Sequence, residues 1–352
     1  MNPSLLPAAL ARAFRRLSGE AWVFDPLGAA VRLPAIAATL GVGFATGYPL
    51  RGVLAASGAY LVGFGAPLDL FGSNPLLLAS VTIVIGASAT LGSIAAAHGY
   101  LAVLVVAALG ALCGLAASRD TATAWIGLQC ALAGVIATSY PASPAVAAKR
   151  ALIIVSGGFT QTVLLSLAGF ARRREPPPAG PAPEPAQPRY ALHLAVGLAV
   201  GLGVERLLAI RNGYWVPATT LLVLRPTTQS TMTRALARSV GTLVGVSAAS
   251  ALLLAAHPQR GLLATLVTAA AFGAYTFQKA TYGFFSACVG AYVVLTMSLG
   301  GSPEREVAVA RMVATLTGAA VGLAVQFVDG ALGKARIVRS RGMFDEKKRP
   351  HA

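Results

Sequence analysis

Charged residues are scarce in this sequence. Only 11% of its 352 residues are Asp, Glu, Lys or Arg, whereas soluble domains contain about a quarter. None of these four residue types occurs between residues 70 and 118. An apolar run of ~20 residues is long enough for a helix to cross a membrane, and further charge-free runs follow this one. The scarcity of charge therefore excludes a soluble protein and indicates an all-α, polytopic membrane protein.

Residues that bind metals or perform catalysis are also few. The three cysteines, Cys113, Cys130 and Cys288, lie inside apolar runs at spacings that match no metal or redox motif. We expect them to pack between helices as small residues. The sequence shows no paired carboxylates, no nucleotide-binding loop and no nucleophile with a neighbouring base. We therefore expect no enzyme activity, no metal and no cofactor.

Basic residues outnumber acidic ones by 28 to 12, which gives a formal net charge of +16. No run of Lys and Arg is interleaved with aromatic residues, so we do not expect nucleic-acid binding. The basic residues lie at helix ends and in tails, where they fix membrane topology and attract anionic lipid. The expected partners are membrane lipids, and a homo-oligomer is compatible with the sequence.

A proline-rich segment divides the chain. Residues 172–189 read RRREPPPAGPAPEPAQPR, which is too rich in proline for a helix and too polar for a lipid core. This linker separates a first membrane block, residues 32–171, from a second membrane block, residues 190–329. We expect six apolar segments in each block, about twelve transmembrane segments in all. The segments lie near residues 32–47, 50–66, 75–97, 100–118, 122–140 and 147–171, and near 190–210, 213–225, 236–256, 261–278, 280–300 and 307–328.

The two blocks resemble one another in sequence. In the last segment of each, an arginine precedes a glycine by seven positions, Arg150 before Gly157 and Arg311 before Gly318. Such matches follow the same order in both blocks, so we predict an internal repeat of six segments. Repeated halves are common in transporters, and the working site then lies near the interface between the repeats.

The two ends of the chain predict the orientation. Residues 1–31 suggest a short amphipathic segment on the membrane surface, or else an ordinary tail. Residues 330–352 form a basic tail suited to anionic lipid. With six segments per block, both ends and the linker lie on one side of the membrane, and this side carries most of the basic residues. The positive-inside rule makes that side cytoplasmic.

One short apolar run stops at an arginine. In GYWVPATTLLVLRP, residues 213–226, the run from Val216 to Leu224 would form a helix of ~14 Å, about half of a bilayer core. Pro226 disfavours helix at Arg225, and the polar run 227–231 follows. Either the helix breaks to present Arg225 to a water-filled cavity, or a tilted helix lets Arg225 reach the headgroups. The sequence leaves both interpretations open.

Three further arginines add to this pattern. Arg234 and Arg238 are four residues apart and share a helix face, and Arg311 precedes a run of small residues. Arginines around a cavity attract anions, and a guanidinium group binds a carboxylate in a fork. Anchoring at the membrane interface would also explain most of them.

Three other residues are candidates for the site. Tyr214 and Trp215 either stack on an aromatic ligand or anchor a helix at the interface. Glu205 is the acidic residue that lies within an apolar segment, beside Arg206. It is a candidate for proton coupling, because transporters often use an embedded carboxylate. A structural pair with an arginine explains it equally well.

Three motifs of the second block resemble the fusaric-acid-resistance-like family. They are GYWVPATTLLVLRP, RALARSVGTLVG at 234–245 and ARMVATLTGAAVG at 310–322. Relatives in that family include bacterial aromatic acid exporters and, more distantly, plant aluminium-activated malate transporters. Over 33–171 the resemblance is weak, because the stretch GYPLRGVLAASGAYLVG lacks the tryptophan and the Arg-x-x-Gly-Thr element. The long exporters carry a large soluble domain between their membrane halves, and here a proline-rich linker stands in its place.

The resemblance implies a bacterial inner-membrane protein that exports or conducts organic anions. We therefore expect export of organic, and in particular aromatic, carboxylates, with the arginines drawing the anion in from the cytoplasm. A passive anion channel would share the arginine-lined cavity without a coupling carboxylate. A non-transporting membrane scaffold is the third interpretation, and it would depend on the linker and tails rather than on a cavity.

Overall fold

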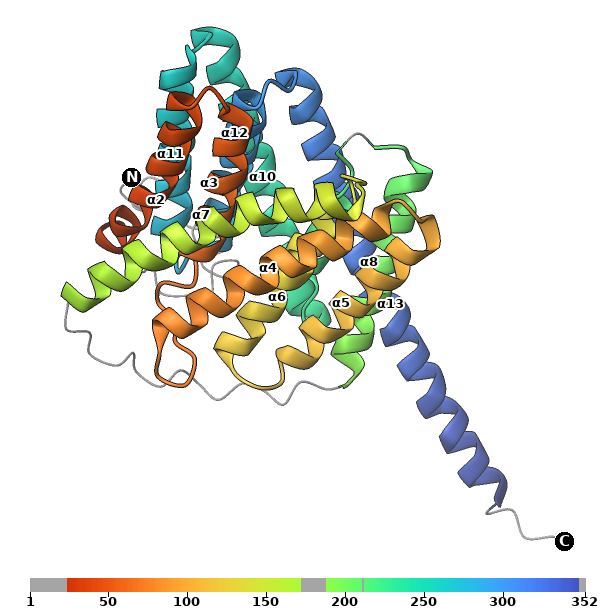
Figure 1. Ribbon diagram of the computed structural model, residues 1–352. Helices are drawn as coiled ribbons and strands as arrows, with labels where there is room; N and C mark the ends of the chain where they lie inside the picture. The colour runs from red at the N-terminus through yellow and green to blue at the C-terminus, as the bar shows by residue number, and fades with distance from the viewer. Residues whose placement is uncertain (1–23, 172–187, 211, 348–352) are drawn as a thin grey trace, which may run out of the picture.

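The computed structural model describes residues 24–171, 188–210 and 212–347. Most of the predicted N-terminal segment, the linker up to residue 187 and the end of the basic tail lie outside these ranges. The described residues form twelve helices and no β-strand, which confirms an all-α architecture (Figure 1). The helices of the first block are α2 Pro26–Ala45, α3 Pro49–Gly63, α4 Asn74–Ala96, α5 Gly99–Ala116, α6 Thr121–Ala137 and α7 Pro144–Ala171. Those of the second block are α8 Pro188–Leu207, α9 Trp215–Val223, α10 Thr228–Ala256, α11 Arg260–Thr276, α12 Tyr282–Leu299 and α13 Glu304–Lys347.

Eight of these helices are long and apolar enough to cross a membrane. This supports the predicted polytopic membrane protein. The four shorter helices are α3, α6, α9 and α11, with 15, 17, 9 and 17 residues. The shortest is α9, which follows from the half-length apolar run before Arg225.

The two largest differences from the helix boundaries that hydropathy predicts are at α10 and α13. Helix α10 begins at Thr228, two turns before the predicted residue 236, because its first turns are polar but still helical. The Thr227 side chain caps this start by accepting a hydrogen bond from the Ser230 amide at 3.3 Å. Helix α13 continues from Glu304 to Lys347, so it passes without a break through the predicted tail boundary at residue 330.

Side-chain caps also fix the connections of the first block. The carboxylate of Asp120 accepts hydrogen bonds from the Thr123 amide at 2.8 Å and from its hydroxyl at 2.6 Å. These bonds stabilise the ionised form and hold the pKa of Asp120 below its usual value. Ser73 caps α4 through the Leu76 amide in the same way. Each cap satisfies an amide at a helix start that has no partner within the helix.

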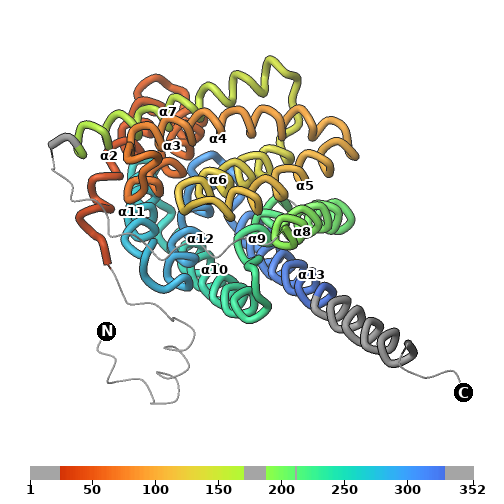
Figure 2. Tube along the Cα trace, turned by 90° about the horizontal axis from the view of Figure 1, so that it is seen from below, coloured from red at the N-terminus to blue at the C-terminus, as the bar shows by residue number. Residues whose placement is uncertain are grey.

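The helices of the two blocks pack in the same pairs. In the first block α3 and α4 pack on α7, while α4 and α5 pack on α6. In the second block α9 and α10 pack on α13, while α10 and α11 pack on α12. The blocks are joined mainly by the contacts of α2 with α11 and of α8 with α5, both visible in Figure 2, and by a smaller contact of α6 with α9.

Close contacts at glycine occur at matching places in the two blocks. A side chain at Gly157 of α7 would collide with the Ala55 carbonyl of α3, and one at Gly318 of α13 would collide with the Val216 carbonyl of α9. The residues of the second pair each lie 161 positions after those of the first. Without a side chain, two helix backbones can approach closely, as is common between membrane helices.

A second set of glycine contacts also occurs at matching places in the two blocks, between the other helices, with a different spacing in residue number. A side chain at Gly92 of α4 would collide with the Gly134 carbonyl of α6, and one at Gly245 of α10 with the Ala287 carbonyl of α12. Here the two pairs are 153 positions apart. These two offsets relate positions in one block to positions in the other.

Candidate functional site

The chain between α9 and α10 is not helical. Helix α9 ends at Val223 and α10 begins at Thr228, so Arg225 and Pro226 lie in the break. A break of this kind leaves backbone carbonyls without helical partners, which is tolerated at membrane depth only where protein or water satisfies them. Side chains from three other helices do so here. Arg234 Nε donates to the Leu222 carbonyl at 2.8 Å, the Tyr190 hydroxyl to the Leu224 carbonyl at 3.2 Å, and Gln326 Nε2 to the Pro226 carbonyl at 3.4 Å.

A threonine holds the backbone of Arg225 itself. The Thr231 hydroxyl accepts a hydrogen bond from the Arg225 amide at 3.0 Å and donates one to the Arg225 carbonyl at 3.2 Å. Thr231 is fully buried, so this member of the polar run 227–231 packs inside the protein. The break is thus a built structure with a fixed path, and its side chains can be placed.

A cavity of about 770 Å³ opens beside the break. Arg225, Arg234 and Arg238 all line it, together with Thr227, Gln229 and Ser230. No Asp or Glu occurs among the described residues that line this cavity. The structure therefore brings three of the predicted site residues together around one positively charged cavity. Ligand pockets for small molecules have volumes of ~300–1,000 Å³.

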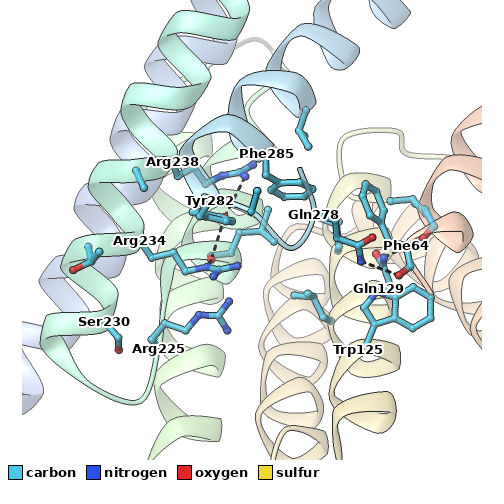
Figure 3. Close-up of a pocket in the computed structure, with 18 of the residues that line it drawn as sticks. Phe64, Trp125, Gln129, Arg225, Ser230, Arg234, Arg238, Gln278, Tyr282 and Phe285 are labelled. Carbon is cyan, nitrogen blue, oxygen red and sulfur yellow. Dashed lines mark hydrogen bonds between the residues drawn. The ribbon is translucent and has the colours of Figure 1, made fainter. Parts of the chain in front are cut away.

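The cavity has two unlike walls (Figure 3). The second block supplies the arginines and Tyr282. The first block supplies an aromatic and amide wall that includes Phe64, Trp125 and Gln129. An anion with an apolar body could place its charge on one wall and its body on the other.

Tyr282 orders the two inner arginines of the cavity. The guanidinium carbon of Arg234 lies 3.7 Å from the centre of the Tyr282 ring. The hydroxyl of the same tyrosine accepts a hydrogen bond from Arg238 Nη1 at 3.3 Å. A cation on an aromatic face is stabilised by the ring electrons, so Tyr282 holds both groups without neutralising them.

The other predicted arginine and the aromatic pair lie outside the cavity lining. Tyr214 and Trp215 are buried, with exposed fractions of 4% and 8%, and their rings contact each other at 4.8 Å. The guanidinium carbon of Arg311 lies 3.3 Å from the centre of the Trp215 ring. These three residues form a group of their own in the core of the second block.

Glu205 also lies away from the cavity. It is half-buried near the end of α8, where a side chain at Gly213 would meet it. Its neighbour Arg206 donates a hydrogen bond to the Gly99 carbonyl of α5 at 2.6 Å. Glu205 therefore belongs to the connection between α8 and α9, and no described contact joins it to the arginines of the cavity.

Sequence reasoning missed the wall that the first block supplies. Gln129 donates to the Leu61 carbonyl at 3.2 Å, and Gln278 donates to the Phe64 carbonyl at 2.9 Å. Gln278 also accepts a hydrogen bond from the buried Arg32 at 2.8 Å. An amide in an apolar run is a detectable signal, because buried polar groups need partners. It could have marked Gln129, which lies in the charge-free run 121–148.

Comparison with known proteins agrees with the motifs of the second block. Residues 191–325 match the family described as fusaric acid resistance protein-like. The predicted family resemblance is confirmed. The family match contains the break, its capping side chains Arg234 and Thr231, and all four candidate arginines. It excludes the first block, whose helices pack in the same pairs.

Curated relatives match a stretch of about the same length as the family match. Inner membrane protein YccS of Escherichia coli (strain K12) is 31% identical over 143 residues, which is 40% of this chain and 20% of the relative. An uncharacterized protein of Synechocystis is 32% identical over 142 residues, 40% of this chain and 18% of the relative. The chain thus spans about a fifth of the length of the relatives it matches. No solved structure matches it.

Proposed function

We propose that this protein transports organic carboxylates, aromatic ones in particular, out of the cytoplasm across a bacterial inner membrane. We propose transport rather than catalysis. The observation that carries the proposal is the cavity with three guanidinium groups and no carboxylate among its described lining residues. Buried or half-buried cations without counter-ions favour an anionic ligand, and a guanidinium fork matches the geometry of a carboxylate.

The opposite wall supports an aromatic body for this anion. Phe64 and Trp125 of this wall, together with Phe285 of α12 beside Phe64, give apolar ring surface to the same cavity. An aromatic ligand gains hydrophobic free energy and ring contacts on such a wall. The neighbouring amide of Gln129 has an Oε1 atom without a hydrogen-bond partner, which could accept a hydrogen bond from a hydroxyl substituent of the ligand.

The position of the cavity supports a transport site between two repeats. The offsets of 161 and 153 residues, which the glycine contacts define, also relate lining residues of the two blocks. The related pairs are Leu61 and Leu222, Phe64 and Arg225, Gln129 and Tyr282, and Leu132 and Phe285. Transporters built from repeats place their substrate sites at the repeat interface. We propose that these blocks are such repeats.

The relative from Escherichia coli is described as an inner membrane protein, which supports the same location here. The basic linker and tails support a cytoplasmic position for both ends. Arg225, which lies in the break, would then meet a cytoplasmic anion before Arg234 and Arg238, which lie further along α10.

Replacement of Arg225 tests the proposal directly. In Arg225→Lys the charge remains but the planar fork is lost, and in Arg225→Gln both are lost. We expect both variants of the purified protein to bind an aromatic carboxylate such as benzoate more weakly, by ~1.5–3 kcal/mol for one charged hydrogen bond. Arg119→Gln is the matched control, because Arg119 is exposed and does not line the cavity. Wild-type binding by both Arg225 variants would show that this residue does not hold the ligand.

A passive anion channel is the second candidate function. It is favoured by the position of Glu205, which does not line the cavity, so that no described lining carboxylate is available for coupling. Proteoliposomes separate the two functions. A carrier coupled to protons accumulates the anion when a pH gradient is imposed, whereas a channel only equilibrates it along its electrochemical gradient.

A further inference from the structure

Two buried arginines without a counter-ion lie at the inner end of the cavity and behind it. Arg238 and Arg311 each have an exposed fraction of 1%. Arg238 Nε and Nη2 and all three guanidinium nitrogens of Arg311 have no hydrogen-bond partner. Arg238 lies on α10 and Arg311 on α13, two helices that pack on each other, and no ion pair in the described part of the chain includes either residue. Two buried cations without a counter-ion are strongly destabilising.

Trp215 covers only part of the Arg311 group. Its ring lies on the guanidinium face, 3.3 Å from the central carbon. The N–H groups of a guanidinium point outward in its plane, so a ring on the face leaves them free to donate. Arg311 is therefore held in place by Trp215 while its donors remain unused.

Hydroxyl groups without partners continue this polar region. They lie on three different helices, each one helical turn after Arg238 or after an aromatic residue that contacts one of the two arginines. They belong to Thr219, which follows Trp215 on α9, to Thr242, which follows Arg238 on α10, and to Ser286, which follows Tyr282 on α12. Each of these side chains is fully buried. Residues four positions apart share a helix face. Buried hydroxyls normally have partners, so this group has the donors of an anion site.

We propose that Arg238 and Arg311 form an inner anion site, behind the open cavity, for one small monovalent anion. Arg238 belongs to both places, because it lines the cavity and is buried on the helix that packs against α13, which carries Arg311. The ligand is either an inorganic anion such as chloride or the carboxylate group of the transported molecule. The inner site rests on the proposed transport function, since it would be the next binding site for an anion that leaves the cavity.

Tryptophan fluorescence can report anion binding at the cavity and at the inner site separately. The chain has three tryptophans, of which Trp125 lines the cavity and Trp215 contacts Arg311. The double variant Trp22→Phe/Trp125→Phe keeps only Trp215. Iodide, an anion that quenches indole on contact, is the probe, and acrylamide is the neutral quencher for comparison. Because Trp215 is buried, a quencher that merely collides from solvent should act weakly.

We expect iodide to quench Trp215 saturably and acrylamide to quench it weakly and without saturation. Arg311→Gln should abolish the saturable part, and Arg119→Gln should keep it. Chloride or benzoate, added as competitor, should relieve the quenching, and the one that competes identifies the source of the anion. Quenching by iodide that does not saturate, or that is no stronger than with acrylamide, would overturn the inner site. This comparison needs no change at Arg311, so it holds even where Arg311→Gln fails to fold.

A second reporter separates failure of the inner site from failure of the proposed function. The variant Trp22→Phe/Trp215→Phe keeps Trp125, whose emission should change when benzoate enters the cavity. A Trp125 response together with absent iodide saturation at Trp215 would reject only the inner site. Absence of the Trp125 response would instead count against carboxylate binding in the cavity, whatever Trp215 shows.

Discussion

Four arginines of the second block are held in different ways, and each arrangement leaves donors for a ligand. Arg225 is fixed through its backbone by Thr231, and Arg234 through a carbonyl and the Tyr282 ring. Arg238 and Arg311 depend on aromatic partners. Aromatic rings and backbone carbonyls orient a guanidinium group without supplying a negative charge. An acidic partner would have fixed these side chains too, but it would have occupied the position of the anion.

Thr231 gives a test of the break at the scale of one residue. Thr231→Val keeps the shape of the side chain but removes the hydroxyl that pairs with both backbone groups of Arg225. We expect a loss of ~1–3 kcal/mol in the free energy of unfolding, because a half-buried amide and carbonyl lose their partner. Thr231→Ser, which keeps the hydroxyl, is the matched control. Unfolding of the detergent-solubilised proteins measures the difference, and equal stability of the two variants would contradict the capping role.

Helices of this protein approach closely where glycine replaces larger residues. In α7 the backbone at Gly157 lies against the Ala55 carbonyl, whereas a methyl group added at Gly169 of the same helix would meet no atom within 4 Å. The contact between α7 and α3 thus depends on Gly157 and not on Gly169. The corresponding contact between α13 and α9 sets the position of the break that carries Arg225.

Gly157 and Gly169 of α7 should respond oppositely to the same substitution. Gly157→Ala forces two backbones apart, and we expect it to destabilise the protein by ~1–3 kcal/mol, as overpacking does. Gly169→Ala meets no obstacle and should stabilise the helix by ~0.5–1 kcal/mol, because alanine restricts the unfolded chain. Thermal unfolding in one detergent compares both with the wild type. A shift of the same sign in both variants would contradict the packing described for α7.

At the scale of the whole molecule, the proposed orientation places both ends and the linker in the cytoplasm. Reporter fusions at residues 10, 180 and 345 should therefore all give a cytoplasmic signal, because the basic residues concentrate in these segments. An additional fusion in the α5–α6 connection at residue 119 samples a short loop within a block. A periplasmic signal at residue 180 would reject an even number of crossings in the first block.

Most of the fold could be predicted from apolar runs alone. Each of the twelve predicted segments overlaps one described helix, because lipid and core both require long apolar stretches. The start of α10 could not be predicted in this way, since its first turns face the cavity and are polar. Arg225, Arg234 and Arg238 could be grouped from their spacing. The contact of Arg311 with Trp215 could not, because it joins helices that are almost a hundred residues apart in sequence.

The unlike walls of the cavity have a consequence for how such a protein could evolve. The position that Arg225 holds in the second block is held by Phe64 in the first, and that of Tyr282 is held by Gln129. A dimer of identical halves would have placed twice as many guanidinium groups around one space, where like charges repel. After the duplication that we propose, loss of the arginines from one copy would relieve this repulsion at no cost to the other. The copy that is freed from binding the charge can then diverge to fit the rest of the cargo, so ligand preference would change through the first block while the charge requirement stays fixed in the second.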